Sequence, residues 1–254
     1  MTHISFSALK IWNECSYKHK LVYIDQIKAF KGNAYTAFGT ALHDVCEKKL
    51  LGENMDDKDY FLTRFKEVLA EIPEEHNEKL VEDMKLQGAK IIPHIMPALN
   101  RYFKEYEVVS AEEDIFEVVD DYKFADFNFK GFIDLVLKTP DGKYHIIDWK
   151  TCSWGWDARR KNDKMTTYQL TFYKHFFAKK HNIDPENIET HFALLKRTAR
   201  KENVEFFRVT SGQTKINNAL NLLENALYNI EKNNHIKNRL SCSKCEFYKT
   251  VNCP

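Results

Sequence analysis

The chain has 254 residues, of which 43% are hydrophobic and 30% are charged, as expected for a globular and soluble protein. Its formal net charge of +1 excludes a general positive field, so any nucleic-acid contact must come from local basic patches. The sequence has no apolar run of about 18 residues and no signal-peptide pattern at its start. We therefore expect no membrane span and a cytoplasmic location.

Two helices are predicted in the N-terminal region. Ser5 is a candidate N-cap for the first helix. The second is expected over residues 34–51 and carries His43, which, as a single histidine, is most simply an ordinary polar residue of a helix. Gly39 is unfavourable inside a helix by propensity and would permit the close approach of another backbone.

The segment from residue 52 to 106 has helical periodicity and carries no recognisable chemical motif. Pro93 and Pro97 are expected to kink or split its last helix. Its acidic residues are most simply a solvated face. We interpret this segment as a helical annex.

From Val108 onward the apolar period changes to two, which predicts strands. One strand is expected over residues 108–119 and the next over residues 122–129, so the sheet should contain an antiparallel meander. Three glutamates lie near its start, and one of them could contribute to a metal site: Glu112, Glu113 and Glu117. Should His43 not be a metal ligand, Glu113 or Glu117 is the reserve ligand that would take its place.

The stretch from Gly131 to Thr151 organises the chain. A Pro-Asp-Gly turn between two apolar runs predicts a β-hairpin. Because residues two apart in a strand share a face, Asp148 and Lys150 should lie together beside Asp134 of the neighbouring strand. Two carboxylates can hold a divalent cation that activates water against a phosphodiester. The lysine can orient that water or offset charge in the transition state.

A surface hairpin with a salt bridge is the alternative interpretation, since Asp-x-Lys is a common pattern. Asp134 and Asp148, however, lie within or at the end of apolar runs. Carboxylates in such positions are costly unless they are paired or bound to metal. This placement favours a metal site.

Residues 153–166 combine two tryptophans with a basic cluster. Aromatic and cationic side chains together suit a nucleic-acid strand, whose bases stack and whose phosphates pair. A disordered surface loop is the equal alternative. The turn containing Arg197 is a second candidate phosphate contact. The candidate DNA-binding residues of the loop are Trp154, Trp156, Arg159, Arg160, Lys161 and Lys164.

Beyond the loop, a helix is expected over residues 165–181. Gln169 and Tyr173 are four residues apart and so share one of its faces. The alternative is that Tyr173 belongs to the core and Gln169 to the rim of the core. Two strands, over residues 188–196 and 204–209, and a final helix are expected after it.

Six cysteines in such a chain are expected to be metal ligands, reactive thiols or core residues rather than disulfides. Cys242, Cys245 and Cys253 have the spacing C-x2-C-x7-C, and a C-x2-C pair can bind one metal centre. Cys15 is the best candidate for a fourth ligand. Two alternatives, Cys46 and Cys152, lie within regular elements and more simply fill space.

In their order along the chain, these motifs resemble those of the PD-(D/E)xK nuclease superfamily. They are most similar to its RecB-type branch with an iron–sulfur cluster, which includes the AddB nuclease domain and CRISPR-associated adaptation exonucleases. The resemblance spans nearly the whole chain. Ile133 replaces the proline of the superfamily name. Ser16 stands where the family often has a proline after its first cysteine. The matching segments are residues 5–9 with Cys15, Gly39-x3-His43, residues 131–134, residues 148–151, Gln169-x3-Tyr173 and the terminal cysteines followed by Pro254.

The resemblance implies an α/β fold with a restriction-endonuclease-like core, in which helices flank a central mixed sheet. Residues 1–254 would form a single nuclease domain with a helical insertion at about 52–106. The implied catalytic residues are Asp134, Asp148, Lys150, Gln169 and Tyr173. The implied ligands of Mg²⁺ or Mn²⁺ are His43, Asp134, Asp148 and the main-chain carbonyl of Trp149.

The resemblance also implies a 4Fe–4S cluster that joins the two termini, with binding segments around residue 15 and at 242–253. Its ligands would be Cys15, Cys242, Cys245 and Cys253. Zinc is the alternative occupant, since four thiolates also suit it. The cysteine spacing and the proline that follows favour iron–sulfur.

The implied activity is a metal-dependent DNA exonuclease acting on single-stranded or end-frayed DNA, in repair, recombination or phage or CRISPR DNA processing. A structure-selective endonuclease is one alternative. A non-cutting DNA-binding subunit of a helicase–nuclease complex is another, although both aspartates and the lysine are intact. No Gly-x4-Gly-Lys phosphate loop is present, so unwinding would need a helicase or recombination partner.

Overall fold

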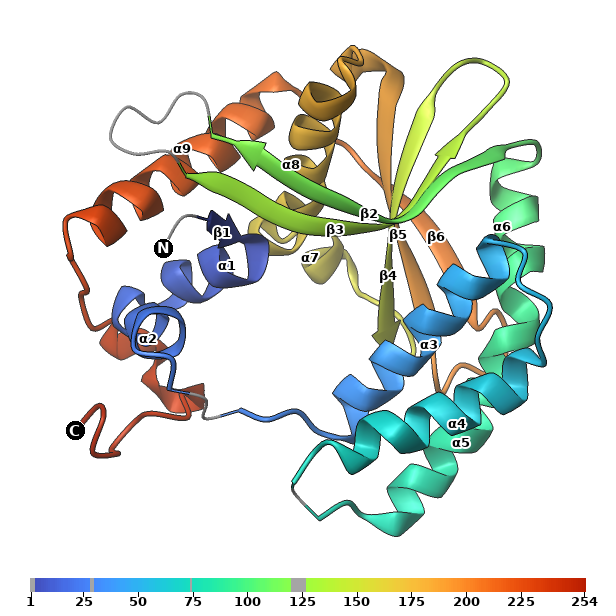
Figure 1. The fold of residues 1–254 in the computed structure, drawn as a ribbon, viewed down its shortest axis with the longest axis horizontal. Helices are drawn as coiled ribbons and strands as arrows, with labels where there is room; N and C mark the ends of the chain where they lie inside the picture. The colour runs from blue at the N-terminus through green and yellow to red at the C-terminus, as the bar shows by residue number, and fades with distance from the viewer. Residues whose placement is uncertain (1–2, 28–29, 74, 120–126) are drawn as a thin grey trace.

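The computed structural model describes residues 3–27, 30–73, 75–119 and 127–254, which form a mixed sheet with helices on both faces (Figure 1). The strands are β1 (His3–Ser5), β2 (Glu107–Val118), β3 (Asn128–Lys138), β4 (Tyr144–Cys152), β5 (Ile188–Lys196) and β6 (Val204–Val209). Strands β2, β3 and β4 form the antiparallel meander that the sequence predicts. The β4–β5 pair is parallel, which makes the sheet mixed and confirms the predicted α/β class.

Strand β3 is the centre of the architecture because three strands pair with it. Strand β2 occupies one edge along nearly its whole length. The other edge is shared, with β1 beside residues 128–130 and β4 beside residues 135–138. Between these two partners β3 and β4 separate, and Asp134 lies at the point of separation.

Most of the longer helices begin at side-chain caps that satisfy free N–H groups of the first turn. Ser5 caps α1 as predicted, and Asn33, Asp56, Asn77, Asp157 and Asp163 cap later helices. The helices are α1 (Phe6–Glu14), α2 (Ser16–His19), α3 (Ala34–Leu50), α4 (Asp57–Ala70), α5 (Glu78–Ile91), α6 (Ile95–Phe103), α7 (Ala158–Lys161), α8 (Lys164–His181) and α9 (Gln213–Glu231). Short turns of other helix types are η1 (Lys20–Ile24), η2 (Ile92–His94), η3 (Pro185–Asn187) and η4 (Arg239–Lys244).

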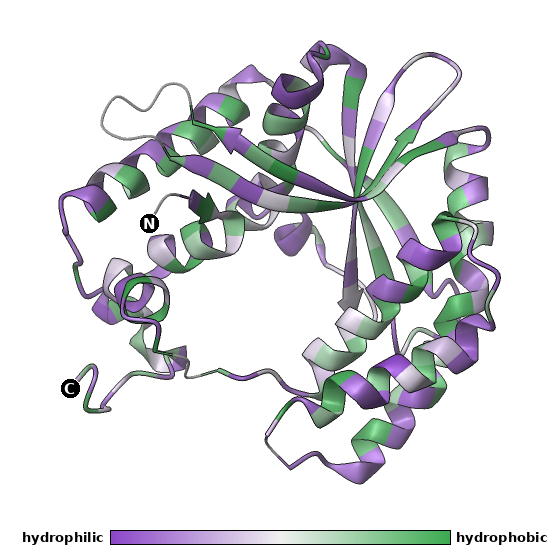
Figure 2. Cartoon of the chain, in the orientation of Figure 1, coloured by the Kyte–Doolittle hydropathy of each residue, from purple (hydrophilic) through white to green (hydrophobic). Residues whose placement is uncertain are grey.

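Two apolar cores lie on opposite faces of the sheet. The α8-side core joins β3 to α1, α8 and α9 and includes Phe129, Ile133 and Phe172. The α3-side core joins the sheet to α3–α6 and includes Leu42, Leu135 and Trp149. Figure 2 shows hydrophobic and hydrophilic residues on each of these helices, as expected for elements that bury one face.

Most predicted elements occur at their predicted places, and the break predicted at the prolines of the annex is the turn η2. The short elements β1 and α7 were not predicted. Tyr122 and Phe124, which belong to a predicted strand, lie outside the described residues. Within the described part of the chain, no helix is both long and apolar enough to cross a membrane.

Candidate active site

The hairpin of β3 and β4 brings the predicted catalytic residues together. Asp148 and Lys150 share a face of β4, and the lysine Nζ lies 2.5 Å from Asp148 Oδ2. Trp149 points the other way and is buried in the α3-side core. Its main-chain N–H donates a hydrogen bond of 2.7 Å to Asp134 Oδ2, across the gap where the two strands separate.

The backbone around Asp134 departs from regular strand alternation. Ile133 packs in the α8-side core, whereas Leu135, two residues later, packs in the α3-side core. In the β2–β3 ladder, Leu135 pairs with Ala111 and Ile133 pairs with Glu113, so Glu112 lies between these two partners. Glu112 has a φ of 52°, a conformation that non-glycine residues rarely adopt. The register of the neighbouring pairs therefore places Glu112 opposite Asp134, at the point where the backbone is irregular.

His43 enters the site from α3. Its Nδ1 lies 3.7 Å from Asp134 Oδ2. Gly39 lies one turn earlier, where an added Cβ would lie 3.4 Å from Thr151 Oγ1. Helix α3 therefore meets a side chain near the end of β4 at an ordinary contact distance, so an alanine would also fit at this position.

Gln169 and Tyr173 reach the site from α8. Gln169 Nε2 donates a hydrogen bond of 3.1 Å to the Tyr173 hydroxyl. An added Cβ at Gly131 would lie only 2.8 Å from the Tyr173 ring, so a glycine on β3 is what lets this ring approach the sheet. Burial raises the pKa of Tyr173, and the charge of Asp148 raises it further.

The electrostatics of this cluster favour binding of a cation. Burial raises the pKa of Asp134 and that of Asp148 to about 6 each. Partial burial and the charges of neighbouring carboxylates, Asp134 first among them, raise the pKa of Glu112 to about 7. Burial alone would lower the pKa of Lys150, but the two aspartates outweigh it and raise that pKa. The buried Asp148 and the half-buried Asp134 next to one lysine leave excess negative charge that a divalent ion would offset.

The donor set fits a divalent metal ion. Burial and the charge of Lys150 lower the pKa of His43 to about 4, so its ring is neutral at neutral pH and can act as a ligand. Carboxylate oxygens and one imidazole suit Mn²⁺ and Mg²⁺. Among the described residues, however, the ligand atoms of His43, Asp134 and Asp148 are not all within 4.8 Å of one another. Asp148 is held by Lys150, so metal binding requires this carboxylate to reorient.

Comparison with known proteins gives the family. Residues 3–250 match the family described as the PD-(D/E)XK nuclease superfamily. The chain belongs to this superfamily. No curated protein sequence matches it.

Two solved structures are similar to this PD-(D/E)XK nuclease. One is a protein titled "Putative exonuclease" from Eubacterium rectale, with 15% identity and a TM-score of 0.64 over 98% of this chain and 89% of that one. The other, titled SSO0001, has 12% identity and a TM-score of 0.46 over 97% of this chain and 84% of that one. At such identities, the first match shows a shared fold.

The candidate DNA-binding residues of the nuclease divide by exposure. Trp154 is 78% exposed and lines a pocket with Tyr35, Arg160 and Arg197. Trp156 is only 7% exposed and packs on Phe192 and Phe207. Its predicted role in base stacking is therefore wrong, because the ring is part of the core.

Arg160 and Arg159 lie on the short helix α7. The Arg160 guanidinium lies 4.4 Å from the centre of the Trp156 ring, and Arg159 is exposed. Arg197 lies 4.8 Å from the centre of the Tyr35 ring and donates hydrogen bonds to Gln87 and Ser153. These contacts hold Arg197 between the loop and the annex.

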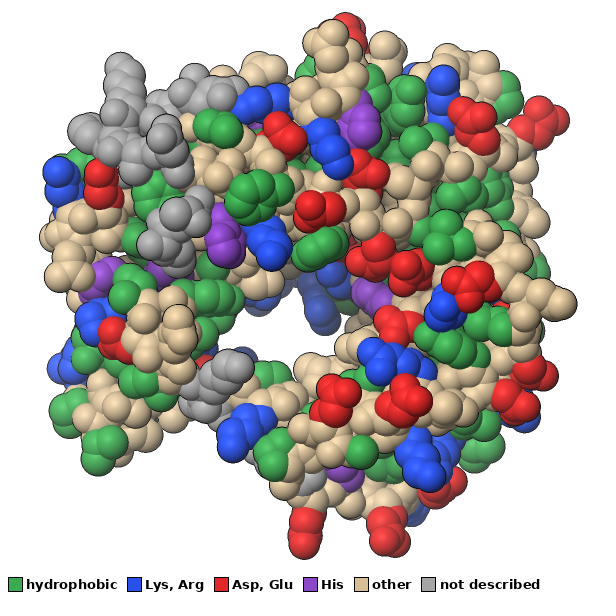
Figure 3. All heavy atoms as spheres, viewed as in Figure 1, with side chains coloured by type: hydrophobic (Ala, Val, Ile, Leu, Met, Phe, Trp, Pro, Cys, Tyr) green, Lys and Arg blue, Asp and Glu red, His purple; other side chains and the backbone are tan. Residues whose placement is uncertain are grey.

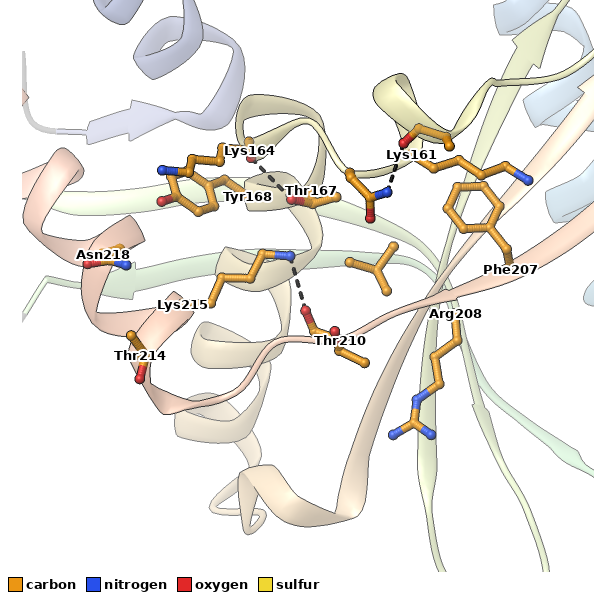
Figure 4. A pocket seen from close by; sticks show the side chains of 13 residues that line it. Lys161, Lys164, Thr167, Tyr168, Phe207, Arg208, Thr210, Thr214, Lys215 and Asn218 are labelled. Atoms are coloured by element: carbon orange, nitrogen blue, oxygen red, sulfur yellow. Dashed lines mark hydrogen bonds between the residues drawn. The ribbon is translucent and has the colours of Figure 1, made fainter.

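Lys161 and Lys164 line a separate basic pocket between α7, α8, β6 and α9 (Figure 4). Lys161 pairs with Glu205 at 2.6 Å. Arg208 and Lys215 line the same pocket. The pocket therefore has the positive charge expected of a phosphate-binding surface.

The four cysteines assigned to a cluster are brought together. Cys15, Cys242, Cys245 and Cys253 line one small pocket where the two termini meet. The Asn238 N–H donates a hydrogen bond of 3.3 Å to Cys15 Sγ, across 223 residues of sequence. Among the described residues, no three of the four sulfur atoms lie within 4.8 Å of one another. Cys46 and Cys152 are buried and separate from this group, as residues that fill space are.

Sequence reasoning identified the wrong reserve carboxylate. Glu113 is held by Lys180 and His181, at 2.7 and 2.9 Å. Glu112, next to it, is the residue whose pKa responds to Asp134 and Asp148. Alternation along a regular strand cannot identify it, since its position depends on a positive φ.

Proposed function

We propose that this nuclease is a divalent-metal-dependent exonuclease that hydrolyses single-stranded or end-frayed DNA. The observation that supports it best is the convergence of Asp134, Asp148 and Lys150 at the separation of β3 and β4, with His43 beside them. This arrangement provides candidate metal ligands and a positively charged lysine in a partly solvated position, as phosphodiester hydrolysis requires.

The chain's own residues would divide the work. His43, Asp134, Asp148 and the Trp149 carbonyl would hold Mg²⁺ or Mn²⁺, which polarises the phosphoryl oxygen and lowers the pKa of bound water. Lys150 would orient the attacking water and offset charge in the transition state. The Trp149 N–H fixes the orientation of the Asp134 carboxylate. The Gln169–Tyr173 pair closes the α8 side of the site.

A gap separates α1 and α2 from α3 in the space-filling view (Figure 3). It offers a route by which a DNA strand could approach Asp148 and Lys150 on β4. Whether that strand needs a free end distinguishes the exonuclease from the structure-selective endonuclease.

The test compares end-labelled linear single-stranded DNA with a covalently closed circle of the same sequence, each with Mn²⁺. We expect shortening of the linear strand and an intact circle. Asp148→Ala is the control for contaminating nuclease and should leave both uncut. Cutting of the circle at a rate close to that of the linear strand would establish the endonuclease instead. No cutting of either by the metal-loaded protein would favour a non-cutting DNA-binding subunit.

We also propose that the four clustered cysteines bind a 4Fe–4S cluster. Lys18, Lys237 and Arg239 line the same pocket and would offset the negative charge of the cluster and its thiolates. Such a cluster would fix the N-terminal helix to the C-terminal segment. DNA repair, recombination or CRISPR-type processing, with a helicase supplying single strands, is the proposed setting.

A further inference from the structure

A second group of potential ligands lies at the other end of the sheet from the active site. His145 is at the start of β4, and Glu189 and His191 are at the start of β5. The His145 Nδ1 and His191 Nε2 atoms are 3.1 Å apart, and Glu189 Oε2 lies 3.9 Å from His145 Nδ1. Both histidines are buried, with 7% and 2% exposure. One ligand atom from each of the three residues lies within 4.8 Å of the others.

The hydrogen bonds around His145 determine its tautomer. Its Nε2 lies 2.9 Å from Thr139 Oγ1. The Thr139 hydroxyl donates its one hydrogen to Asp141 or to the Lys143 carbonyl, so it must accept from His145 Nε2–H. The Nδ1 of the neutral ring therefore carries a lone pair that points at His191 and Glu189.

His191 has an oxygen partner in the equivalent position. Its Nδ1 lies 3.4 Å from the Tyr102 hydroxyl on α6. The phenol can either donate to this nitrogen or accept from it. When it accepts, His191 Nε2 also carries a free lone pair. Each histidine then donates its outer N–H to an oxygen, the arrangement that orients metal-binding imidazoles.

Glu189 supplies a charged oxygen. Its Oε1 forms salt bridges with both neighbouring basic side chains, at 3.1 Å from Lys143 Nζ and 3.1 Å from Arg208 Nη2. The Oε2 is the atom that faces His145. The group lines an open pocket with Lys104, Glu105 and Pro140, so an ion could reach it from solvent.

We propose that His145, His191 and Glu189 form a binding site for a transition-metal ion of the zinc class, separate from the catalytic centre. Two imidazoles and one carboxylate are one of the usual sets of three protein ligands for a zinc ion whose fourth position is open. Nitrogen ligands select zinc, nickel or copper over magnesium. The bound ion would join the first residues of β4 and β5 and would change the tautomer of His191.

Cobalt(II) tests the proposal, because it replaces zinc and its visible absorption reports its ligands. The full-length protein is titrated with Co²⁺ in excess Mg²⁺. Wild type should take up one equivalent more than His191→Phe does, and the difference spectrum should show visible bands without the near-ultraviolet bands of thiolate ligation, which separates this site from the cysteines. His191→Phe should lose that equivalent, and Tyr102→Phe should weaken it by about 10–100-fold. His94→Ala, which removes an exposed histidine, is the matched control and should bind normally.

Glu189→Gln provides a second variant should His191→Phe fold poorly, since it leaves both imidazoles in place. It should also weaken Co²⁺ binding. Nitrogen-15 shifts of the His191 ring should report a tautomer change on zinc addition in wild type. Equal Co²⁺ uptake by wild type, His191→Phe and Glu189→Gln would overturn the proposal and leave the two histidines as a hydrogen-bonded pair.

Discussion

The Trp149 N–H donates a 2.7 Å hydrogen bond to Asp134 Oδ2, which joins β3 and β4 just beyond the last residues that pair in their ladder. A side-chain carboxylate thus takes the place of a backbone acceptor as the strands separate. The bond orients Asp134 toward His43, and it couples the main chain of one predicted ligand to the side chain of another.

This relationship predicts different effects for two substitutions of Asp134. Asp134→Asn and Asp134→Ala should both abolish cleavage, because each removes a charged ligand. Only the alanine leaves the Trp149 N–H without its acceptor, which should destabilise the protein by about 1–3 kcal/mol relative to the asparagine variant. Urea denaturation in EDTA measures this difference. Equal stability of the two variants would show that the hydrogen bond contributes little.

The pH dependence of metal-free stability should differ between wild type and Asp134→Asn. Burial raises the pKa of Asp134 from 3.8 to about 6, so the folded state holds this proton more tightly than the unfolded state does. Ionising Asp134 therefore lowers wild-type stability as the pH rises from about 4 to about 6. Between pH 4.5 and 8, the asparagine variant should gain about 2 kcal/mol relative to wild type. No relative gain would mean that the carboxylate titrates normally.

His43 should control the choice of metal. Its pKa, lowered to about 4, keeps the ring neutral, and an imidazole ligand favours Mn²⁺ over Mg²⁺. His43→Ala should lose most activity, and His43→Asp should retain some while shifting the preference toward Mg²⁺. Glu47→Gln, one turn along α3, is the control and should change little. Full activity of His43→Ala with an unchanged Mn²⁺/Mg²⁺ ratio would leave Glu112 as the next candidate ligand.

The sequence predicted the hairpin and the grouping of its candidate catalytic residues because local signals specify them. The Pro-Asp-Gly turn and the alternation of the strands determine which face Asp148 and Lys150 share. Glu112 was not distinguished from its neighbours, since its position depends on an irregular backbone opposite Asp134. Strand β1 was missed because three residues carry no periodicity, and its pairing with β3 is a long-range contact.

Trp156 shows a different limit of prediction from sequence. A tryptophan among arginines in a polar segment has the composition of a nucleic-acid contact, yet its ring fills the core against Phe192. Composition alone cannot tell which of two nearby tryptophans is buried. The strands β5 and β6 that receive Trp156 lie some forty residues further along the chain, so only the tertiary structure separates it from Trp154.

Trp154 should therefore be the aromatic contact to DNA in this loop. Trp154→Ala should weaken single-stranded DNA binding by about 1–3 kcal/mol with little change in salt dependence, because stacking releases no counterions. Arg159→Ala should instead reduce the salt slope by about 0.7. Arg101→Ala, exposed on α6, is the control. Fluorescence anisotropy at several salt concentrations separates the two effects. Normal binding by Trp154→Ala would assign the loop to ordinary surface.

The clustered cysteines give the last prediction. A single zinc ion holds its thiolates about 3.8 Å apart, given tetrahedral geometry and Zn–S bonds of about 2.3 Å. The four sulfurs here are spread more widely, since no three of them among the described residues lie within 4.8 Å of one another. A four-iron cluster binds each cysteine at a different corner and so suits a wider separation. Protein purified without oxygen should therefore be brown.

Cys245→Ser should lose the colour and much of the thermal stability together, because the site connects segments 223 residues apart in sequence and closing so long a loop is costly in entropy. Cys152→Ala is the control, since Cys152 is buried outside this pocket and should leave the colour intact. Iron, sulfide and zinc analysis of the same samples distinguishes the occupants. Colourless protein with one zinc per chain would replace the iron–sulfur proposal and would require the four sulfurs to move closer together.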